Sequence, residues 1–169
     1  IQELAEQSYA LLGSSAMPKK VFPEQAAFNL LARTSKPERN GFSRLENRVA
    51  AEVRRVLAPA KVPLSLSIVL APVFHSYSIM AHVELAGDVP AAEVESCLKG
   101  NDAFRLMAAG DTGTVSPVTV AGKDRIFVGP VRKDPALPRS YWLWAVADNL
   151  TVGSALNAYG IARALFGGA

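Results

Sequence analysis

The sequence has little cysteine and no long apolar run. Cys97 is the single cysteine among 169 residues, which excludes an internal disulfide framework and is typical of a protein of the reducing cytoplasm. No apolar run approaches the roughly 18 to 20 residues that a membrane span requires. Residues 1–12 have the pattern of an amphipathic helix with glutamates, unlike the basic and then apolar pattern of a signal peptide. We therefore expect a cytoplasmic protein without a membrane segment.

Three kinds of binding motif are also missing. No glycine-rich turn joins a strand to a helix, so a dinucleotide-binding fold is not expected in this chain. Histidine, cysteine and carboxylates do not occur at metal-ligand spacings, and no metal site is expected. The net charge is only +3, and basic residues are scattered or paired with acids. This distribution argues against a nucleic-acid partner, which needs a clustered basic face.

The residues that are present indicate a folded globular protein. Half of them are hydrophobic and 20% are charged, which argues against disorder. The length predicts a single domain over residues 1–169. No N-cap residue precedes Ile1, so we expect the first helix to begin inside a longer helix of a longer protein.

Hydrophobic periodicity predicts an α+β fold. The clearest helix covers residues 43–57, because Ser43 and Glu46 have the spacing of a capping box. Further helices are expected at 1–12, 90–98 and 149–166, and strands at 26–32, 65–74, 80–85, 124–131 and 141–147. This order predicts a mixed, mostly antiparallel sheet covered by helices.

A polar island interrupts the longest stretch of strand-forming residues, 65–85. It reads His75-Ser76-Tyr77-Ser78 and follows Pro72, which cannot donate to a strand ladder and so predicts an edge, a bulge or a break. Hydroxyl groups and an imidazole that gather between two strands are typical of a place where side chains converge on a ligand. The charged residues of helix 43–57, in contrast, are better explained by a solvated face with helical ion pairs, each contributing about 0.3–0.5 kcal/mol, than by a ligand site.

Four stretches together resemble the C-terminal half of aspartate-semialdehyde dehydrogenases. They are AAFNLLA, SRLENRVAAEVRRVL, VLAPVFHSYSIMAHVEL and VGPVRKDPALPRSYWLWAVADNLTVGSALNA, of which the last is the most specific. The resemblance implies the semialdehyde dehydrogenase dimerisation-domain fold, which is like the C-terminal domain of glyceraldehyde-3-phosphate dehydrogenase. It also implies a cytosolic homodimer of an amino-acid biosynthesis enzyme. In that enzyme an N-terminal dinucleotide-binding domain, which we expect to be absent from this chain, binds NADP and supplies a catalytic cysteine.

The resemblance implies four polar groups in this half of the enzyme, and a gapless alignment retains one charge. The family's glutamate, which holds the substrate amine, falls on Leu45, and its phosphate-binding lysine falls on Arg48. The arginine that clamps the substrate carboxylate falls on Leu70, and a leucine cannot hold a carboxylate. The histidine that exchanges protons falls on Tyr77. Arg48 is therefore the expected substrate-binding residue, and Tyr77 marks the catalytic position.

His75 is an alternative catalytic base. It lies two residues before Tyr77, and a two-residue shift of the turn would preserve the face on which the side chain lies. That shift would not replace the clamp lost at Leu70. In the closing stretch, Asn149 and Gly153 keep positions that the resemblance places near the nicotinamide end of a cofactor. Within this chain alone, a helix cap and a close-packing glycine are the favoured interpretation of these two residues.

Two functions follow from these residues. The favoured one is a binding and dimerisation domain of a non-catalytic homologue, silent toward aspartyl phosphate, with no cofactor in this chain. The alternative is the C-terminal domain of an active NADP-dependent enzyme that interconverts an acyl phosphate and a semialdehyde, with His75 as base. A homodimer is expected in either case, because the central strands carry apolar residues on both faces and a lone domain would leave one face exposed.

Overall fold

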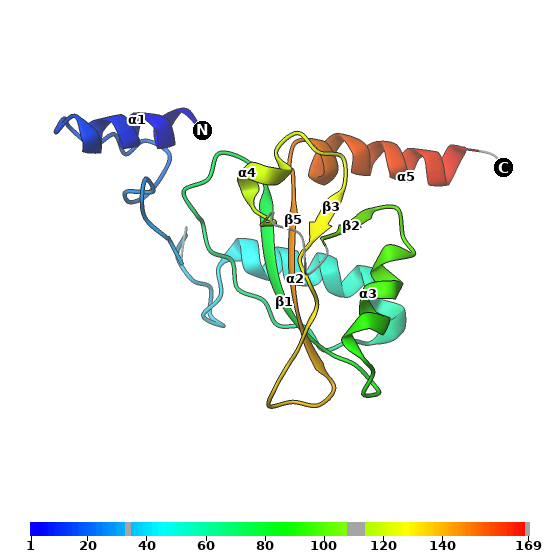
Figure 1. Cartoon of the computed structure of the whole chain (residues 1–169). Helices are drawn as coiled ribbons and strands as arrows, with labels where there is room; N and C mark the ends of the chain where they lie inside the picture. The colour runs from blue at the N-terminus through cyan, green and yellow to red at the C-terminus, as the bar shows by residue number, and fades with distance from the viewer. Residues whose placement is uncertain (33–34, 108–113, 168–169) are drawn as a thin grey trace. The chain divides into compact units, whose positions relative to one another are not determined.

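The computed structural model describes residues 1–32, 35–107 and 114–167. They form two compact units, Ile1–Phe74 and His75–Ala169, and each is described by itself (Figure 1). The expectation of one domain over the whole chain stays a prediction. In the described residues, no helix is both long and apolar enough to cross a membrane.

In the first unit, two buried polar side chains of α1 (Gln2–Leu12) organise the segment that follows. The carboxylate of Glu3 accepts the backbone N–H groups of residues 20–22 at 2.6–3.0 Å. The side-chain oxygen of Gln7 accepts those of residues 26–27 at 2.7 and 3.1 Å. These bonds hold the segment against the helix above a small apolar cluster, whose buried members are Leu4, Ala26, Ala27 and Leu31.

The strand predicted at 26–32 does not form. The backbone N–H groups at 26–27 bind Gln7 in place of a neighbouring strand, and Phe28 has a φ of 54°, outside the extended region. Leu31 alone pairs, in an isolated bridge with Leu70. The strand predicted at 65–74 is wrong for the same kind of reason, because a side chain captures the N–H of Ile68.

The helix predicted at 43–57 is confirmed as α2 (Arg44–Val56), with its capping box complete. The Ser43 hydroxyl accepts the N–H of Glu46 at 3.2 Å, and the Glu46 carboxylate accepts the N–H of Ser43 at 2.7 Å. A single 3₁₀ turn, η1 (Ala58–Ala60), follows.

The second unit is built on one five-stranded sheet. Its path is β1-β5-β3-β2, with β4 paired to β5, and only the β2–β3 pair is parallel (Figure 1). The strands are β1 (Tyr77–Glu84), β2 (Phe104–Leu106), β3 (Ile126–Val128), β4 (Arg132–Lys133) and β5 (Ser140–Ala147). The helices are α3 (Ala91–Lys99), α4 (Pro117–Val120), the π-helical η2 (Thr151–Leu156) and α5 (Asn157–Phe166). The α+β class with a mixed, mostly antiparallel sheet is thus confirmed.

Three boundaries in this unit differ from the predicted ones. The strand predicted at 80–85 begins earlier, at Tyr77, and so includes part of the polar island. The strand predicted at 124–131 shrinks to β3, because Pro130 lacks the N–H that a ladder needs. The helix predicted at 149–166 begins with a π-helical segment at Thr151.

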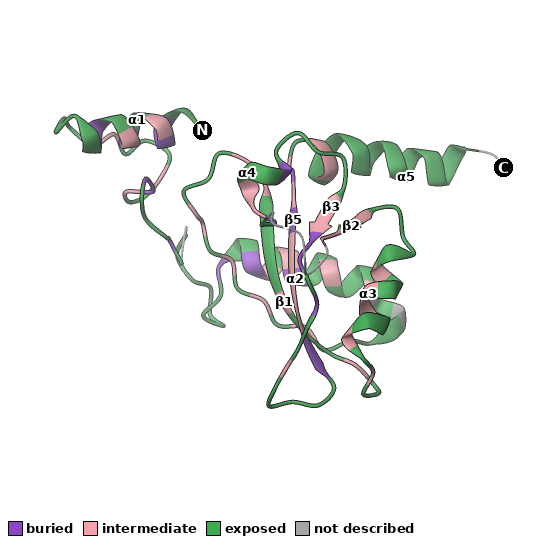
Figure 2. Cartoon of the chain, in the orientation of Figure 1, coloured by how far each residue is buried: buried purple, intermediate pink, exposed green. Residues whose placement is uncertain are grey.

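The core of this unit lies under α4, on one face of β5. The buried residues Val115, Val120 and Val146 pack with Phe127 and Trp144, among others. Burying a side chain of this size contributes about 1.5–3 kcal/mol. Figure 2 shows β5 as buried or intermediate, whereas β1 and α5 are almost wholly exposed. The apolar face of the edge strand β1 therefore has no cover within the described residues of this unit.

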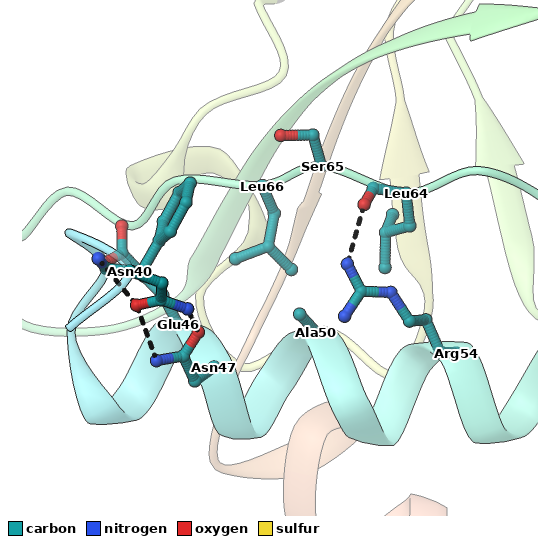
Figure 3. Close-up of a pocket in the computed structure, with 9 residues that line it drawn as sticks. Asn40, Glu46, Asn47, Ala50, Arg54, Leu64, Ser65 and Leu66 are labelled. Atoms are coloured by element: carbon teal, nitrogen blue, oxygen red, sulfur yellow. Dashed lines mark hydrogen bonds between the residues drawn. The ribbon is translucent and has the colours of Figure 1, made fainter. Parts of the chain in front are cut away.

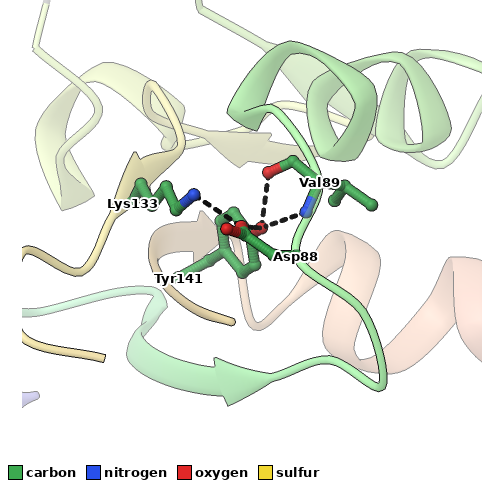
Figure 4. Close-up of polar contacts among 4 residues, drawn as sticks. All are labelled: Asp88, Val89, Lys133 and Tyr141. Atoms are coloured by element: carbon green, nitrogen blue, oxygen red, sulfur yellow. Dashed lines mark hydrogen bonds and ion pairs between the residues drawn. The ribbon is translucent and has the colours of Figure 1, made fainter. Parts of the chain in front are cut away.

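Tyr141 anchors the loop that leads into α3 (Figure 4). Its side chain is buried, and its hydroxyl donates to the carbonyl of Val89 at 2.6 Å and accepts the N–H of the same residue at 3.0 Å. Asp88 beside it forms an ion pair with Lys133 of β4, and this contact raises the pKa of Lys133. One phenol thus fixes both backbone groups of a loop residue 52 positions away.

Candidate functional site

The second unit brings four of the five predicted site residues together. The side-chain oxygen of Asn149 accepts the backbone N–H of Ser76 at 2.7 Å, which joins the turn at His75 to the segment after β5. The ring of Tyr77 lies against Gly153, since a Cβ added to Gly153 would stand 3.0 Å from Tyr77 Cε2. We call residues 75–77 with 149–153 the turn site.

The turn site contains strain and unpaired polar atoms. Ser76 has a φ of 86°, a conformation that costs a residue with a side chain on the order of 1–3 kcal/mol. Among the described residues, the buried atoms Ser76 Oγ and His75 Nδ1 have no hydrogen-bond partner. Strained residues and unsatisfied buried polar groups are uncommon, and they gather at functional sites. The polar island that the sequence singled out is therefore a site candidate on geometric grounds.

Asp148 holds the other side of the turn site. Its buried carboxylate accepts the backbone N–H groups of Gly122, Leu150 and Thr151 at 2.7–3.0 Å. These bonds, the one from Gly122 first, lower the pKa of Asp148 to about 2 despite its burial. Sequence reasoning missed this residue, although an aspartate just before a helical segment is a capping signal.

Asn149 and Gly153 have contacts that serve the fold. The amide oxygen of Asn149 is occupied by Ser76, and Gly153 faces an aromatic ring. Gly153 packs closely, as its structural interpretation expected, but Asn149 is not a helix cap, because the π-helical segment has Leu150 as its N-cap residue and no side-chain cap.

In the first unit, Glu46 is the most heavily bonded side chain of the predicted charged face. Its buried carboxylate accepts the N–H and hydroxyl of Ser43, the N–H of Ile68 and the hydroxyl of Ser67 at 2.7–3.2 Å. These bonds, that from the Ser43 N–H first, lower the pKa of Glu46 to about 2. The sequence placed Glu46 on a solvated face, and this was wrong because the segment at 67–68 lies over it.

A small hollow of about 170 Å³ lies between α2 and residues 64–66 (Figure 3). At one end, Arg54 donates from Nη2 to the carbonyl of Leu64 at 3.0 Å. At the other end, the side-chain amides of Asn40 and Asn47 bond to each other at 2.8 Å. Because the polar groups at both ends bond to each other or to the backbone, we interpret the hollow as a packing gap between α2 and residues 64–66.

Arg48 lies on an open part of α2. Its side chain is exposed and pairs with Glu52 at 3.6 Å, which is the helical ion pair expected from the sequence. Arg48, Arg44, Leu45 and Ser35 line an open hollow of about 410 Å³, which we call the arginine hollow. Arg48 belongs to the first unit and the turn site to the second.

Leu70 is part of an apolar environment. Its side chain packs against the cluster that contains Leu4 and Leu31, and its backbone exchanges two hydrogen bonds with Leu31 at 2.9 and 3.0 Å. A charged side chain at this position would have to leave that cluster to reach a ligand.

Comparisons with known proteins agree with this architecture. A family model described as semialdehyde dehydrogenase, dimerisation domain, matches residues 1–152. The USG-1 protein homolog of Pseudomonas aeruginosa is 35% identical over 158 residues, which are 94% of this chain and 47% of that protein. The aspartate-semialdehyde dehydrogenase of Shewanella violacea is 32% identical over 165 residues, which are 98% of this chain and 49% of that enzyme. The chain thus spans about half the length of these relatives.

A solved structure shares the fold. It is aspartate semialdehyde dehydrogenase II of Vibrio cholerae complexed with ASA, which is 30% identical with a TM-score of 0.88. The match covers 96% of this chain and 48% of that one.

Proposed function

Because this chain belongs to the semialdehyde dehydrogenase family, whose dimerisation domain it matches, we propose that it is the binding and dimerisation part of a homologue that does not turn over aspartyl phosphate. The resemblance implies that enzymes of this family carry substrate-binding and acid–base groups in this half.

The observation that carries the proposal is the environment of Leu70. The resemblance places the clamp for the substrate carboxylate at this position, where the structure has an aliphatic side chain packed against an apolar cluster. Loss of one hydrogen bond to a charged group costs about 1.5–3 kcal/mol of binding free energy. Leu45 likewise replaces the glutamate that the resemblance implies at its position. Two such losses together remove most of the recognition of an amino-acid substrate.

One observation favours the alternative, an active enzyme with His75 as base. The Nδ1 atom of His75 is buried and has no hydrogen-bond partner in the part of the chain that the structure describes, beside the strained Ser76. A base held in this way gains a partner when substrate or water binds. Such an enzyme would also need a cysteine and an NADP-binding domain from outside the 169 residues.

We also propose a homodimer formed through the sheet of the second unit. The exposed side chains of Tyr77, Ile79 and Val83 lie on one face of β1 and make an apolar strip along the edge of the sheet. A second copy related by a twofold axis is the simplest cover for such a strip. The single cysteine is the ground for proposing the cytoplasm as its compartment.

An assay of NADP reduction tests the function. The purified chain, supplied with NADP, phosphate and aspartate semialdehyde, should form no NADPH, and the same result is expected after His75→Gln. Turnover that His75→Gln abolishes would overturn the proposal in favour of the enzyme. The same assay can be run on a longer form of the protein. A cysteine in a strand-to-helix turn of the N-terminal part of that longer form would favour the active enzyme.

A further inference from the structure

We propose that residues 64–70 are an open strand edge, and that the same residues of a second copy of this chain pair with it in antiparallel register. The inference rests on the proposed homodimer and deepens it, since it names a contact that the two copies make through the first unit. The homodimer proposed above brings the copies together through β1, which lies in the second unit.

Residues 64–70 have the side-chain pattern of a strand. The even-numbered residues are partly buried and the odd-numbered ones are exposed, which is the period of two of an extended chain. The partly buried residues are Leu64, Leu66, Ile68 and Leu70, and the exposed ones are Ser65, Ser67 and Val69. Within the described residues, this stretch pairs only in the isolated bridge between Leu70 and Leu31. The stretch thus has strand geometry without a strand beside it.

The backbone groups of this stretch that have partners belong to even-numbered residues. The carbonyl of Leu64 and the N–H of Ile68 bond to side chains of α2 at 3.0 and 2.9 Å, and Leu70 exchanges two bonds across the bridge. Successive residues of a strand direct their N–H and C=O groups to opposite edges, so those of the odd-numbered residues point the other way. No backbone group of the described residues bonds to them. Three alternate residues therefore offer a donor and an acceptor each along one edge.

This edge lacks the protection that isolated strand edges usually carry, which is a charged side chain or a proline within the strand. Residues 62–83 contain no aspartate, glutamate, lysine or arginine. Pro63 and Pro72 lie on either side of the stretch and leave its interior free to pair. The family model that matches residues 1–152, and so includes this stretch, is described as a dimerisation domain. These observations favour a second copy as the occupant of the edge.

A second copy matches this edge in register. With Ser67 on the twofold axis, its N–H and C=O bond to those of the same residue in the other copy. Ser65 then faces Val69 of the partner subunit, and the two strands exchange about six backbone hydrogen bonds. Three such residue pairs bury far less than the roughly 1,000 Å² of a stable interface. The pairing therefore forms within the homodimer and does not hold two copies together by itself.

Nitroxide labels on the full 169-residue chain measure this register by electron paramagnetic resonance. Cys97→Ser removes the exposed native thiol, and the label is attached to Ser67→Cys or, in a second protein, to Ser65→Cys. Where light scattering shows a dimer, the Cα atoms at position 67 should stand about 5.5 Å apart, so the spectrum should be strongly broadened. Those at position 65 should stand about 14 Å apart and broaden it much less. Dilution with unlabelled chain should remove the broadening.

Two variants test the backbone bonds themselves. Ser67→Pro removes an N–H of the open edge and is compatible with an extended backbone, so it should weaken the dimer at least about tenfold in sedimentation equilibrium. Ser67→Ala is the matched control, because both variants lose the hydroxyl that donates to Glu46 and only proline changes the edge. The alanine variant should change the dimer affinity less than about twofold.

A dimer whose labels at position 67 show no broadening would overturn the pairing and leave the proposed homodimer standing. Equal broadening at positions 65 and 67 would also overturn it, because that pattern belongs to parallel strands in register. A chain that stays monomeric at micromolar concentration contradicts both the pairing and the homodimer. NADP-dependent turnover is a separate readout, and turnover with the pairing intact contradicts only the non-catalytic function.

Discussion

The carboxylate of Glu46 accepts the backbone N–H of Ile68 at 2.9 Å, and this bond joins α2 to a segment 22 residues further along the chain. The same carboxylate caps the helix through Ser43. One side chain therefore holds a helix start and a non-helical segment together, beside the helix face that carries Leu45 and Arg48.

Replacement of Glu46 should make the chain less stable and less sensitive to acid. The pKa of Glu46 is lowered from 4.5 to about 2 in the folded chain, so its contribution to the free energy of unfolding is complete above about pH 4.5. It is lost as the pH falls through 4.5 toward 2. Glu46→Gln should lower Tm at pH 7, flatten the acid limb of the Tm profile, and speed hydrogen exchange at the amide of Ile68.

Glu52→Gln is the matched control for this test. It removes the same charge from an exposed pair on the same helix, and should leave both Tm and the exchange of Ile68 near the wild-type values. If Glu46→Gln retained the full acid dependence of the native chain, the lowered pKa of Glu46, to which the bond from the Ser43 N–H contributes most, would not be the source of that dependence.

How much of the fold and of the candidate site could be predicted from the sequence depends on how far apart in the chain the interacting residues lie. The capping box at Ser43 and Glu46 is local, and the sequence predicts it correctly. The missing strand at 26–32 depends on Gln7, a side chain 19 residues away that binds the N–H of Ala26, and no local pattern carries that information. The residues of the turn site were predicted separately, the polar island at 75–78 from its sequence pattern and Asn149 and Gly153 from a resemblance. The bond between Ser76 and Asn149, which spans 73 positions, required the structure.

Removal of the buried hydroxyl of Tyr141 should destabilise the second unit. Tyr141→Phe leaves the N–H and the carbonyl of Val89 without the partner that both share, which costs about 1–3 kcal/mol in the free energy of unfolding. Urea denaturation followed by circular dichroism measures this loss. Tyr159→Phe, at an exposed position of α5, is the control and should be neutral. A neutral Tyr141→Phe would mean that water replaces the phenol.

Relief of strain at Ser76 should stabilise the chain. Glycine adopts a φ of 86° without steric cost, so Ser76→Gly should raise the free energy of unfolding by about 1 kcal/mol. It also removes a buried hydroxyl that has no hydrogen-bond partner among the described residues. Ser78→Gly, in the extended strand β1, should do the opposite. A destabilised Ser76→Gly, measured by the same denaturation, would show that the serine hydroxyl has a bound partner in solution.

The contact between Gly153 and Tyr77 predicts a coupled pair of substitutions. Gly153→Ala places a methyl group 3.0 Å from Tyr77 Cε2 and should destabilise the chain by about 1 kcal/mol, since the ring must shift. In a Tyr77→Ala background the same change should stabilise by up to about 1 kcal/mol, because alanine favours helical backbone. A double-mutant cycle measures the coupling. Additive effects would mean that the ring does not rest on Gly153 in solution.

The last prediction concerns the exposed strip of β1. A stable interface buries more than about 1,000 Å² in total, and a twofold pair of sheets that share this strip provides a mainly apolar one. Ile79 and Val83 lie on the same face of β1 and are 57% and 36% exposed, so a charge at either position would be buried without a partner in the dimer. Light scattering at micromolar concentration should show a dimer for the native chain and for Val118→Lys, which places a charge at an apolar residue of α4 that is 88% exposed. Ile79→Lys should shift the chain to a folded monomer. A native chain that is monomeric under these conditions, or a dimer that tolerates Ile79→Lys, would contradict association through this face.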